Sequence, residues 1–432
     1  MMSTSKTITR LIACHGSIQL VTVLSVLSYR EKEQQELNFK YKNYLVITPL
    51  WACQEQNDEF ADVIEKMAKS ICSWEKIVYI SYELQTQLIV KTLNSSGLSE
   101  TSSLVHELLG VKSPDELYLS REWMFINQLL MNIYESAEKI CYGDGIGIYC
   151  PQSAFPPPSS LKSSHTYLKT MYASLKDKIK GLFPKYKSIK EILTLLFPPK
   201  TLLREKEFDV GYFSIPYAFN EVPPMKTVIL DRAVFLNTLE SLRETLDSLI
   251  DINYLNDLRT IIQDVSTSIL LTSNFSEAVG RMSMDNEIAA YREFLEAEVV
   301  PANSILLIKP HPRDSKLKIL KLKSILSDLY ANIFLLSEES LFYLPFELFF
   351  MEVFLNPNDA KLNCHKIFTF SSACLTLEFL FNAQCTVGFG SNIVEKLFYQ
   401  DQVFSRLKHE ADLISTIREI RYLNGALIFS GR

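Results

Sequence analysis

Apolar positions along this chain follow two periods. Short apolar runs of strand length alternate with longer segments in which apolar residues recur at the spacing of an amphipathic helix. The first part of the chain is predicted to contain strands at Thr9–Cys14, Tyr44–Thr48, Lys76–Ser81 and Lys139–Tyr142, with helices beginning near Ile18 and covering Asp58–Ile71 and Glu122–Tyr134. Regular alternation of strand and helix is typical of a doubly wound parallel sheet.

The same alternation returns in the second part of the chain. Two helical segments, Asn237–Ile250 and Asn253–Asp264, come first and are expected to bridge two lobes. The elements predicted after them are strands at Ser268–Thr272, Ser304–Lys309, Ile333–Leu336, Lys366–Phe370 and Thr386–Gly390, and helices at Asp285–Glu298, Ser315–Tyr330, Pro345–Phe354, Ser372–Phe381 and Glu410–Tyr422. The pattern therefore predicts an α/β protein with two Rossmann-like, doubly wound domains.

The segment Leu11–Tyr29 contains no acidic or basic residue and could be mistaken for a signal peptide or a membrane span. Its polar residues, among them Gln19 and Thr22, do not suit hydrocarbon, and it has no small-residue cleavage site. A strand, a tight turn and a helix fit better. The turn would be formed by His15, Gly16 and Ser17, which become candidates for a loop of the substrate site.

Composition changes in the middle of the chain. Pro156–Pro158 cannot be helix or central strand, and the segment Lys162–Lys206 carries eleven lysines and arginines against three acidic residues. Apolar residues alternate with these lysines. The segment is predicted either to touch anionic lipid or a polyanionic glycan, or to form a solvated flap of the first domain.

Bulk properties limit the class of protein. A chain of 432 residues with 47% apolar and 22% charged residues has room for two or three globular domains. A net charge of −6 gives no general attraction for nucleic acid. None of the eight cysteines forms a CxxC motif, which favours reduced thiols in a cytoplasmic protein, with peripheral membrane contact if Lys162–Lys206 binds lipid.

The first candidate site residues lie at the end of the predicted strand Ser304–Lys309. In open α/β sheets ligands bind beyond the carboxyl ends of the strands. Lys309, Pro310 and His311 stand there, and His311 is held between two prolines and can donate to a phosphate oxygen. The alternative is a histidine that only caps local backbone. Because Lys309 and Arg313 flank it, we favour an anion site.

A second candidate follows Lys366–Phe370. Ser371 and Ser372 open a helix and offer hydroxyls and N–H groups to a phosphate, although serine is also an ordinary helix cap. We expect this motif and the His311 motif to end neighbouring strands of one sheet. Thr272 and Ser273, at the end of another strand, are predicted to join the same nucleotide site.

Two acidic motifs complete the set. Asp144 lies between Gly143 and Gly145 at the end of Lys139–Tyr142, where it could accept a proton from a sugar hydroxyl as a general base or simply form a turn. Glu347, early in Pro345–Phe354, could accept both hydroxyls of a ribose or interact with the helix dipole.

The order of these motifs is more specific than any one of them. A small-acidic-Gly motif, then His-Pro, then Pro-x-Glu, then Ser-Ser, spread over Cys141–Phe381, resembles the bacterial sialyltransferases of the GT-B fold. The resemblance points in particular to the capsular α-2,8-polysialyltransferase-like family and its lipooligosaccharide sialyltransferase relatives, which carry acidic-acidic-Gly, His-Pro and Ser-Ser motifs.

The resemblance implies a reaction and roles. Sialic acid would be transferred with inversion from CMP-sialic acid to a glycan or glycolipid acceptor, without a metal ion or other cofactor. Asp144 would be the base, His311 would contact the CMP phosphate, and Ser371 and Ser372 would bind that phosphate, while Glu347 would hold the ribose. The chain departs from the family pattern at Gly143, where relatives usually have Asp or Glu.

The predicted organisation follows the same resemblance. An N-terminal acceptor domain would cover residues 1–225, with a basic insertion at about 160–206. A nucleotide-sugar-binding domain would cover 226–400, and a last helix over 401–432 would pack back on the first domain. The active site is expected in the cleft between the domains. Two alternatives remain: a transferase that uses another CMP- or CDP-activated donor, such as CMP-Kdo or a CDP-polyol, and a glycan-binding relative without activity.

Overall fold

The computed structural model describes residues 6–49, 54–93, 97–121, 124–143, 145, 203, 206–215, 225–263, 265–277, 280–298, 300–301, 303–336, 342–355 and 366–430. The described residues form two units, and the chain passes from the first to the second between Thr238 and Leu239. Asp144 and most of the basic segment Lys162–Lys206 lie outside the described residues, so the predictions for them stay predictions.

The first unit contains a seven-stranded parallel sheet. Its strands are β1 (Thr7–Cys14), β2 (Lys40–Ile47), β3 (Lys76–Tyr79), β4 (Glu116–Leu119), β5 (Glu138–Cys141), β6 (Val210–Phe213) and β7 (Lys226–Ile229). Their order in the sheet is β3-β2-β1-β4-β5-β6-β7, and every described pairing is parallel. Because the chain first moves from β1 to one side and then returns to β4 on the other, the sheet is doubly wound.

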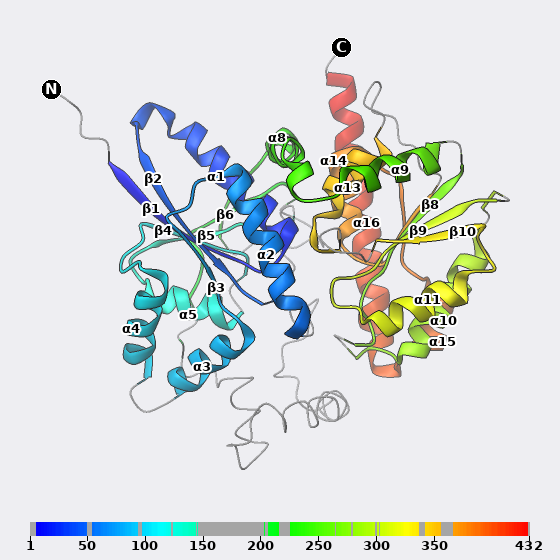
Figure 1. The fold of residues 1–432 in the computed structure, drawn as a ribbon, viewed down its shortest axis with the longest axis horizontal. Helices are drawn as coiled ribbons and strands as arrows, with labels where there is room; N and C mark the ends of the chain where they lie inside the picture. The colour runs from blue at the N-terminus through cyan, green and yellow to red at the C-terminus, as the bar shows by residue number, and fades with distance from the viewer. Residues whose placement is uncertain are drawn as a thin grey trace. The chain divides into compact units, whose positions relative to one another are not determined.

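Helices cover both faces of this sheet (Figure 1). They are α1 (Ser17–Glu33), α2 (Gln54–Ile71), α3 (Tyr82–Leu93), α4 (Gly97–Leu109) and α5 (Phe125–Ile133). The strands and α3, α4 and α5 share one apolar core, while α1 and α2 pack together on the opposite face. This division is what right-handed crossovers require in a doubly wound sheet.

The segment without charges forms a strand, a turn and a helix, as predicted. β1 ends at Cys14 and α1 begins at Ser17. The hydroxyls of Thr22 and Ser25 donate at 2.8 Å to carbonyl oxygens four residues earlier, so these polar groups are satisfied inside the helix. No helix within the described residues is long and apolar enough to cross a membrane.

The second unit contains a five-stranded parallel sheet in the order β10-β9-β8-β11-β12. The strands are β8 (Thr267–Leu271), β9 (Ile305–Lys309), β10 (Asn332–Leu335), β11 (Lys366–Thr369) and β12 (Cys385–Val387). The two doubly wound parallel sheets confirm the predicted α/β class with two Rossmann-like halves. The predicted last strand is shorter than expected, because Gly388 and Gly390 have φ values of 84° and 80°, which end the extended conformation.

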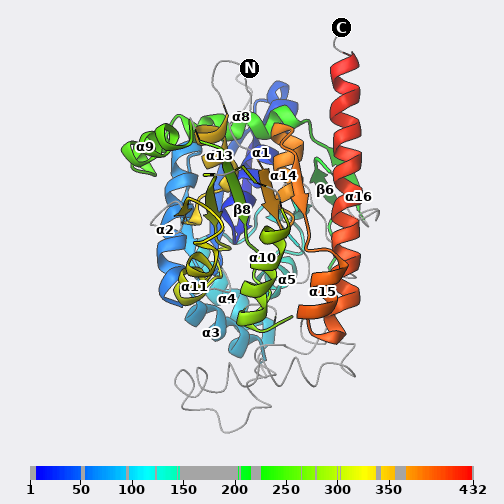
Figure 2. The same ribbon diagram turned by 90° about the vertical axis from the view of Figure 1, so that its right-hand side faces the viewer.

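Two layers of helices enclose this sheet (Figure 1). The helices of the unit are the second half of α8 (Arg232–Arg243), the 3₁₀ turn η4 (Leu246–Ser248), α9 (Ile252–Gln263), α10 (Met284–Ala297), α11 (Lys316–Leu326), α13 (Phe346–Phe354), α14 (Ala373–Phe381), α15 (Ser391–Leu397) and α16 (Gln400–Ser430). One apolar core joins the sheet to α10, α11 and α15. α9 packs on α13, and α16 runs along α14 and α15 (Figure 2). Packing of the last helix on the first domain stays a prediction.

A buried charge cluster lies at the amino end of the first sheet. Arg10 of β1 and Arg30 of α1 both contact Glu116, the first residue of β4, at 3.0 and 2.6 Å. Arg10 also pairs with Glu31, and Arg30 with Glu138; both of these partners are 43% exposed. Glu116 is the carboxylate of this cluster that is buried with the arginines, so its single negative charge serves both guanidinium groups, and Glu31 and Glu138 supply the remaining negative charge.

Replacing Glu116 by Gln should therefore destabilise the first unit strongly. Removal of one member of a buried ion pair typically costs about 3–5 kcal/mol, because it leaves charge without compensation. The measurement is urea unfolding followed by circular dichroism. Glu138→Gln is the matched control and should cost about 1 kcal/mol or less, as expected of a half-exposed pair. Equal losses in both variants would contradict the central place of Glu116.

Candidate active site

Three loops of the second unit leave the same edge of the five-stranded sheet. β8 lies between β9 and β11, with Leu271 paired to Lys309 on one side and to Thr369 on the other. Pro310–His311 follows β9, Thr272–Ser273 follows β8 and Ser371–Ser372 follows β11. The prediction that the His-Pro and Ser-Ser motifs end neighbouring strands is thus wrong, because one strand separates them. Thr272 and Ser273 follow that intervening strand.

The direction of the chain reverses between β8 and β11. From β8 the chain moves outward to β9 and β10, and it then returns to β11 and β12 on the other side. In open α/β sheets the crevice at such a switch point, beyond the carboxyl ends, is the usual ligand site. The Thr272–Ser273 and Ser371–Ser372 loops flank this point.

Three hydrogen bonds hold the His311 turn in place. The backbone N–H of His311 donates to Oγ1 of Thr272 at 2.9 Å and to Oδ2 of Asp314 at 3.0 Å. The Thr272 hydroxyl donates to the same Asp314 oxygen at 2.9 Å. Asn274 adds bonds to the Arg313 carbonyl and to Asp314. The loops after β8 and β9 are therefore fastened together, and the predicted residues Thr272 and His311 are in direct contact.

The same turn selects one tautomer of His311. The backbone N–H of Arg313 donates to Nδ1 of His311 at 3.1 Å, so in the neutral ring the proton is on Nε2. Burial, and after it the charges of Arg313, Lys318 and Lys309, hold the pKa of His311 well below its usual 6.5. At neutral pH His311 is thus an uncharged ring with an Nε2–H donor.

Sequence reasoning missed the acidic anchor of this turn. Asp314 is 2% exposed and accepts from Nζ of Lys318 at 2.8 Å, and Lys318 also donates to Glu287 at 2.6 Å. Glu287 in turn accepts from the Ser276 hydroxyl, so a buried network continues under both loops. The signal was available in the sequence, because a carboxylate three residues after His311 is placed to accept its N–H.

Ser371 and Ser372 stand at the start of α14. Ser371 Oγ accepts from the N–H of Ala373 at 3.4 Å, and Ser372 is the N-cap residue but makes no side-chain capping bond. Both serines are only partly buried. The positive end of the helix dipole and a serine hydroxyl not used for capping are therefore presented beyond the end of β11.

Lys309 and Glu347 lie on the other face of the sheet from α10 and α11. Leu306 and Ile308 face those helices, so Lys309 follows the strand alternation to the opposite side, where its Nζ donates to the carbonyl of Phe342. Burial lowers the pKa of Lys309 to about 7, against the effect of Glu347 and Asp314. Burial raises the pKa of Glu347, in the first turn of α13, to about 7. These residues support α13, and their contact with a nucleotide stays a prediction.

In the first unit, β1 and β5 end at the same edge on either side of β4. His15 is held by the side chain of Gln19. The amide nitrogen of Gln19 lies 2.7 Å from Nε2 of His15, and its amide oxygen accepts the backbone N–H of His15 at 3.1 Å. Gly16 caps α1 and Ser17 is its first residue. The Tyr142 hydroxyl donates to the carbonyl of Ala13 at 2.6 Å and so ties the end of β5 to the end of β1. The predicted loop His15–Ser17 and the Gly143–Gly145 motif therefore start from one edge.

Gly143 has a structural reason to be glycine. Its φ is 79°, in the left-handed region that other residues adopt at a cost, and it is buried. Glycine adopts this conformation at the least cost. Gly145 is also buried, while Asp144 between them lies outside the described residues.

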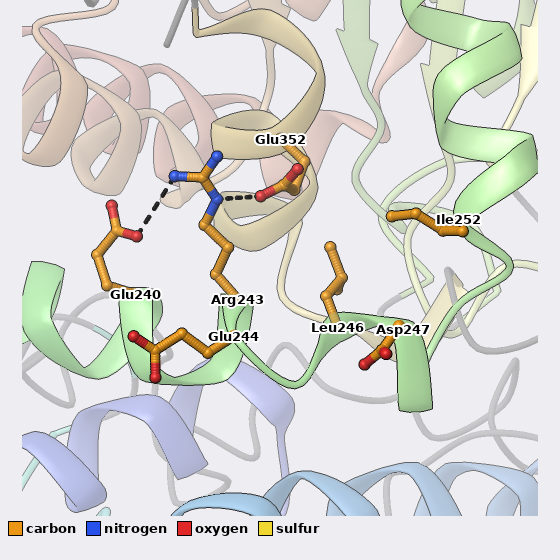
Figure 3. Close-up of a pocket in the computed structure, with 7 residues that line it drawn as sticks. All are labelled: Glu240, Arg243, Glu244, Leu246, Asp247, Ile252 and Glu352. Carbon is orange, nitrogen blue, oxygen red and sulfur yellow. Dashed lines mark hydrogen bonds and ion pairs between the residues drawn. The ribbon is translucent and has the colours of Figure 1, made fainter.

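A separate pocket of about 410 Å³ contains none of the predicted site residues. Figure 3 shows its lining from α8, η4, α9 and α13, which includes Glu240, Arg243, Asp247 and Glu352. Arg243 and Arg259 both bind the Glu352 carboxylate. These ion pairs join three helices and explain the polar lining without a ligand. Within the described ranges, no group of His, Cys, Asp and Glu side chains could hold a metal ion.

Comparisons with known proteins give one family and several distantly similar structures. The family model described as alpha-2,8-polysialyltransferase (POLYST) matches residues 10–353. None of the curated proteins matches the chain. Similar solved structures include UDP-GlcNAc 2-epimerase from Neisseria meningitidis bound to UDP-GlcNAc, at 13% identity and TM-score 0.48, covering 90% of this chain and 85% of that one. The Methanocaldococcus jannaschii UDP-GlcNAc 2-epimerase with UDP-GlcNAc and UDP is 10% identical with TM-score 0.44, covering 95% and 92%.

The depressed pKa of His311 gives a pH prediction. The unfolded chain would protonate this imidazole below about 6.5 while the folded protein keeps it neutral, so acidification through this range favours unfolding. In the folded protein the ring signal of His311, assigned by its loss in His311→Gln, should not titrate between about pH 8 and 5.5 by NMR. The control is the urea-unfolded chain, in which all six histidines should titrate together. A folded-state midpoint near 6.5 would contradict the burial argument.

Proposed function

The chain belongs to the alpha-2,8-polysialyltransferase family, since the family model covers most of its length, and on this premise we propose that it transfers sialic acid from CMP-sialic acid to a sialic-acid-containing glycan with inversion. The observation that best supports the proposal is that β9, β8 and β11 end at one edge of the sheet. The loops that follow these strands carry His311, Thr272 and the serine pair. We assign the donor phosphate to this edge.

The phosphate would be held by dipoles and neutral donors. His311 offers an Nε2–H, because Nδ1 is occupied by the Arg313 N–H. The hydroxyls of Ser371 and Ser372 supply further donors, and the positive end of the α14 dipole favours an anion. Negative charge builds up on the leaving phosphate as its bond to the sugar breaks, so these donors stabilise the transition state more than the bound donor.

The proposed reaction forms one bond at the sialic acid carbon and breaks another. The acceptor hydroxyl loses its proton to Asp144, its oxygen forms the new bond to the sialic acid carbon, and the bond from that carbon to the phosphate oxygen breaks on the opposite face. CMP leaves with the electron pair. The neutral His311 ring donates a hydrogen bond from its Nε2–H to the departing phosphate oxygen as negative charge builds up there.

The base is the part of the proposal that depends on the family resemblance. Asp144 matches the second acidic position of the family motif, and Gly143 takes the first. The flanking strand ends beside β4, on the edge that also carries His15–Ser17. An acceptor bound at this edge would meet both loops, and the family points to polysialic acid as that acceptor.

Loss of the phosphate donors should weaken nucleotide binding. Replacing His311 by Ala removes a charge-assisted hydrogen bond, which is worth about 1.5–3 kcal/mol, so the Kd for CMP should rise about 10- to 150-fold. The double variant Ser371→Ala, Ser372→Ala should show a loss of similar size. Calorimetry with CMP measures both. Ser324→Ala with Ser327→Ala, at exposed positions of the same unit, is the matched control. Unchanged CMP affinity in both test variants would refute the placement of the phosphate.

Loss of the base should act on turnover alone. Asp144→Asn should lower transfer about 10²–10⁴-fold, the usual size of general-base catalysis, and leave the Kd for CMP nearly unchanged. Assays with CMP-sialic acid, CMP-Kdo and CDP-glycerol on the wild type identify the donor. Normal turnover by the Asn variant would mean that another carboxylate is the base. Wild-type protein that consumes no donor would favour a glycan-binding protein.

A further inference from the structure

One ion pair of α16 is inserted into the edge of the sheet that carries the serine motif. Arg406 and Glu410 lie one helical turn apart, and Nε of Arg406 donates to Oε1 of Glu410 at 2.6 Å. The two side chains are 1% and 6% exposed. Figure 2 shows α16 passing α14 and α15, the helices that follow β11 and β12. The pair thus reaches from the last helix into the carboxyl edge of the second sheet.

Arg406 contacts the two loops that flank the switch point. Its Nη1 donates at 3.2 Å to the carbonyl of Phe370, the residue directly before Ser371. Its guanidinium lies 4.6 Å from the ring centre of Phe275, which belongs to the loop after β8. One side chain therefore fixes the backbone that leads into the serine pair and also packs on the loop that carries Thr272 and Ser273.

Glu410 is itself fixed by the loop after β12. Its two carboxylate oxygens accept the N–H groups of Phe389 and Gly390 at 3.0 and 3.1 Å. Gly388 has a φ of 84°, and a Cβ at this position would come within 2.5 Å of the carboxylate. Because the loop encloses Glu410 so closely, the carboxylate cannot move without it, and Arg406 is held in the orientation that meets Phe370.

We propose that Arg406 is a positioning residue, which sets Ser371, Ser372 and the first turn of α14 at the place where they receive the donor phosphate, and that Glu410 orients Arg406 for this task. The inference rests on the proposed role of the serine pair in nucleotide binding. Arg406, near the C-terminal end of the chain, would affect phosphate binding only through Ser371 and Ser372.

Arg406→Lys is the main test. Lysine keeps the charge but lacks the planar guanidinium group, whose N–H groups donate to the Phe370 carbonyl and the Glu410 carboxylate at the same time. The Kd for CMP should rise by about tenfold, a typical size for a coupled neighbour. Arg421→Lys is the matched control, because Arg421 of the same helix binds Glu378, near the opposite end of α14. The control should leave the Kd for CMP unchanged.

A double-mutant cycle separates positioning from general loss of stability. Arg406→Lys is combined with Ser371→Ala and Ser372→Ala, and CMP binding is measured in all four backgrounds. If Arg406 acts through the serines, the lysine variant should weaken binding in the wild type and have little further effect once the serines are gone. Equal effects in both backgrounds would overturn the proposal. Should the lysine variant not fold, Glu410→Gln, which frees Arg406 without removing it, replaces it in the same cycle.

The outcomes distinguish this proposal from the one on which it rests. Wild-type protein that does not bind CMP would refute the proposed function. CMP binding that depends on the serine pair but not on Arg406 or Glu410 would refute only the positioning role.

Discussion

The carboxylate of Asp314 is the contact on which the candidate site depends. It accepts from the His311 N–H, the Thr272 hydroxyl and Lys318, so a single group joins the loops after β8 and β9 to the base of α11. A buried carboxylate is tolerated only when it is fully hydrogen-bonded and compensated, which Lys318 and Asn274 achieve here. The geometry of His311 is therefore set by the protein interior, before any ligand arrives.

Parallel topology explains why residues far apart in sequence meet. Strands that all run one way bring their carboxyl ends to one edge, and strand order decides which loops are neighbours. The loop of Thr272 lies between those of His311 and Ser371 because β8, the first strand of the unit, is central in the sheet. Charge is balanced below this edge by the Glu287–Lys318 pair, while at the edge the charge of Arg313 acts on the neutral His311 ring.

Sequence periodicity predicted most of the framework, because long apolar runs such as Ser304–Lys309 and amphipathic stretches such as Asp58–Ile71 have a clear period. Strands β4, β6 and β7 and helices α3 and α4 were not predicted. The short length of these strands is not the reason, because β3, β5, β10 and β11 are equally short and were predicted. Motifs identified His311, Thr272 and Ser371 correctly as strand-end residues. The order of β8 between β9 and β11, and the contacts of Arg406 with both loops, arise from tertiary packing that spacing along the chain does not encode.

The electrostatics of this edge suit a leaving phosphate better than a permanently bound one. In the proposed reaction the donor is a phosphodiester with a single negative charge, and the departing CMP gains more. A fixed cation would hold both forms tightly, whereas a neutral imidazole and the end of α14 interact more strongly as charge develops. The neutral His311 ring suits this role, because its Nδ1 accepts the Arg313 N–H and its Nε2–H is left as a hydrogen-bond donor.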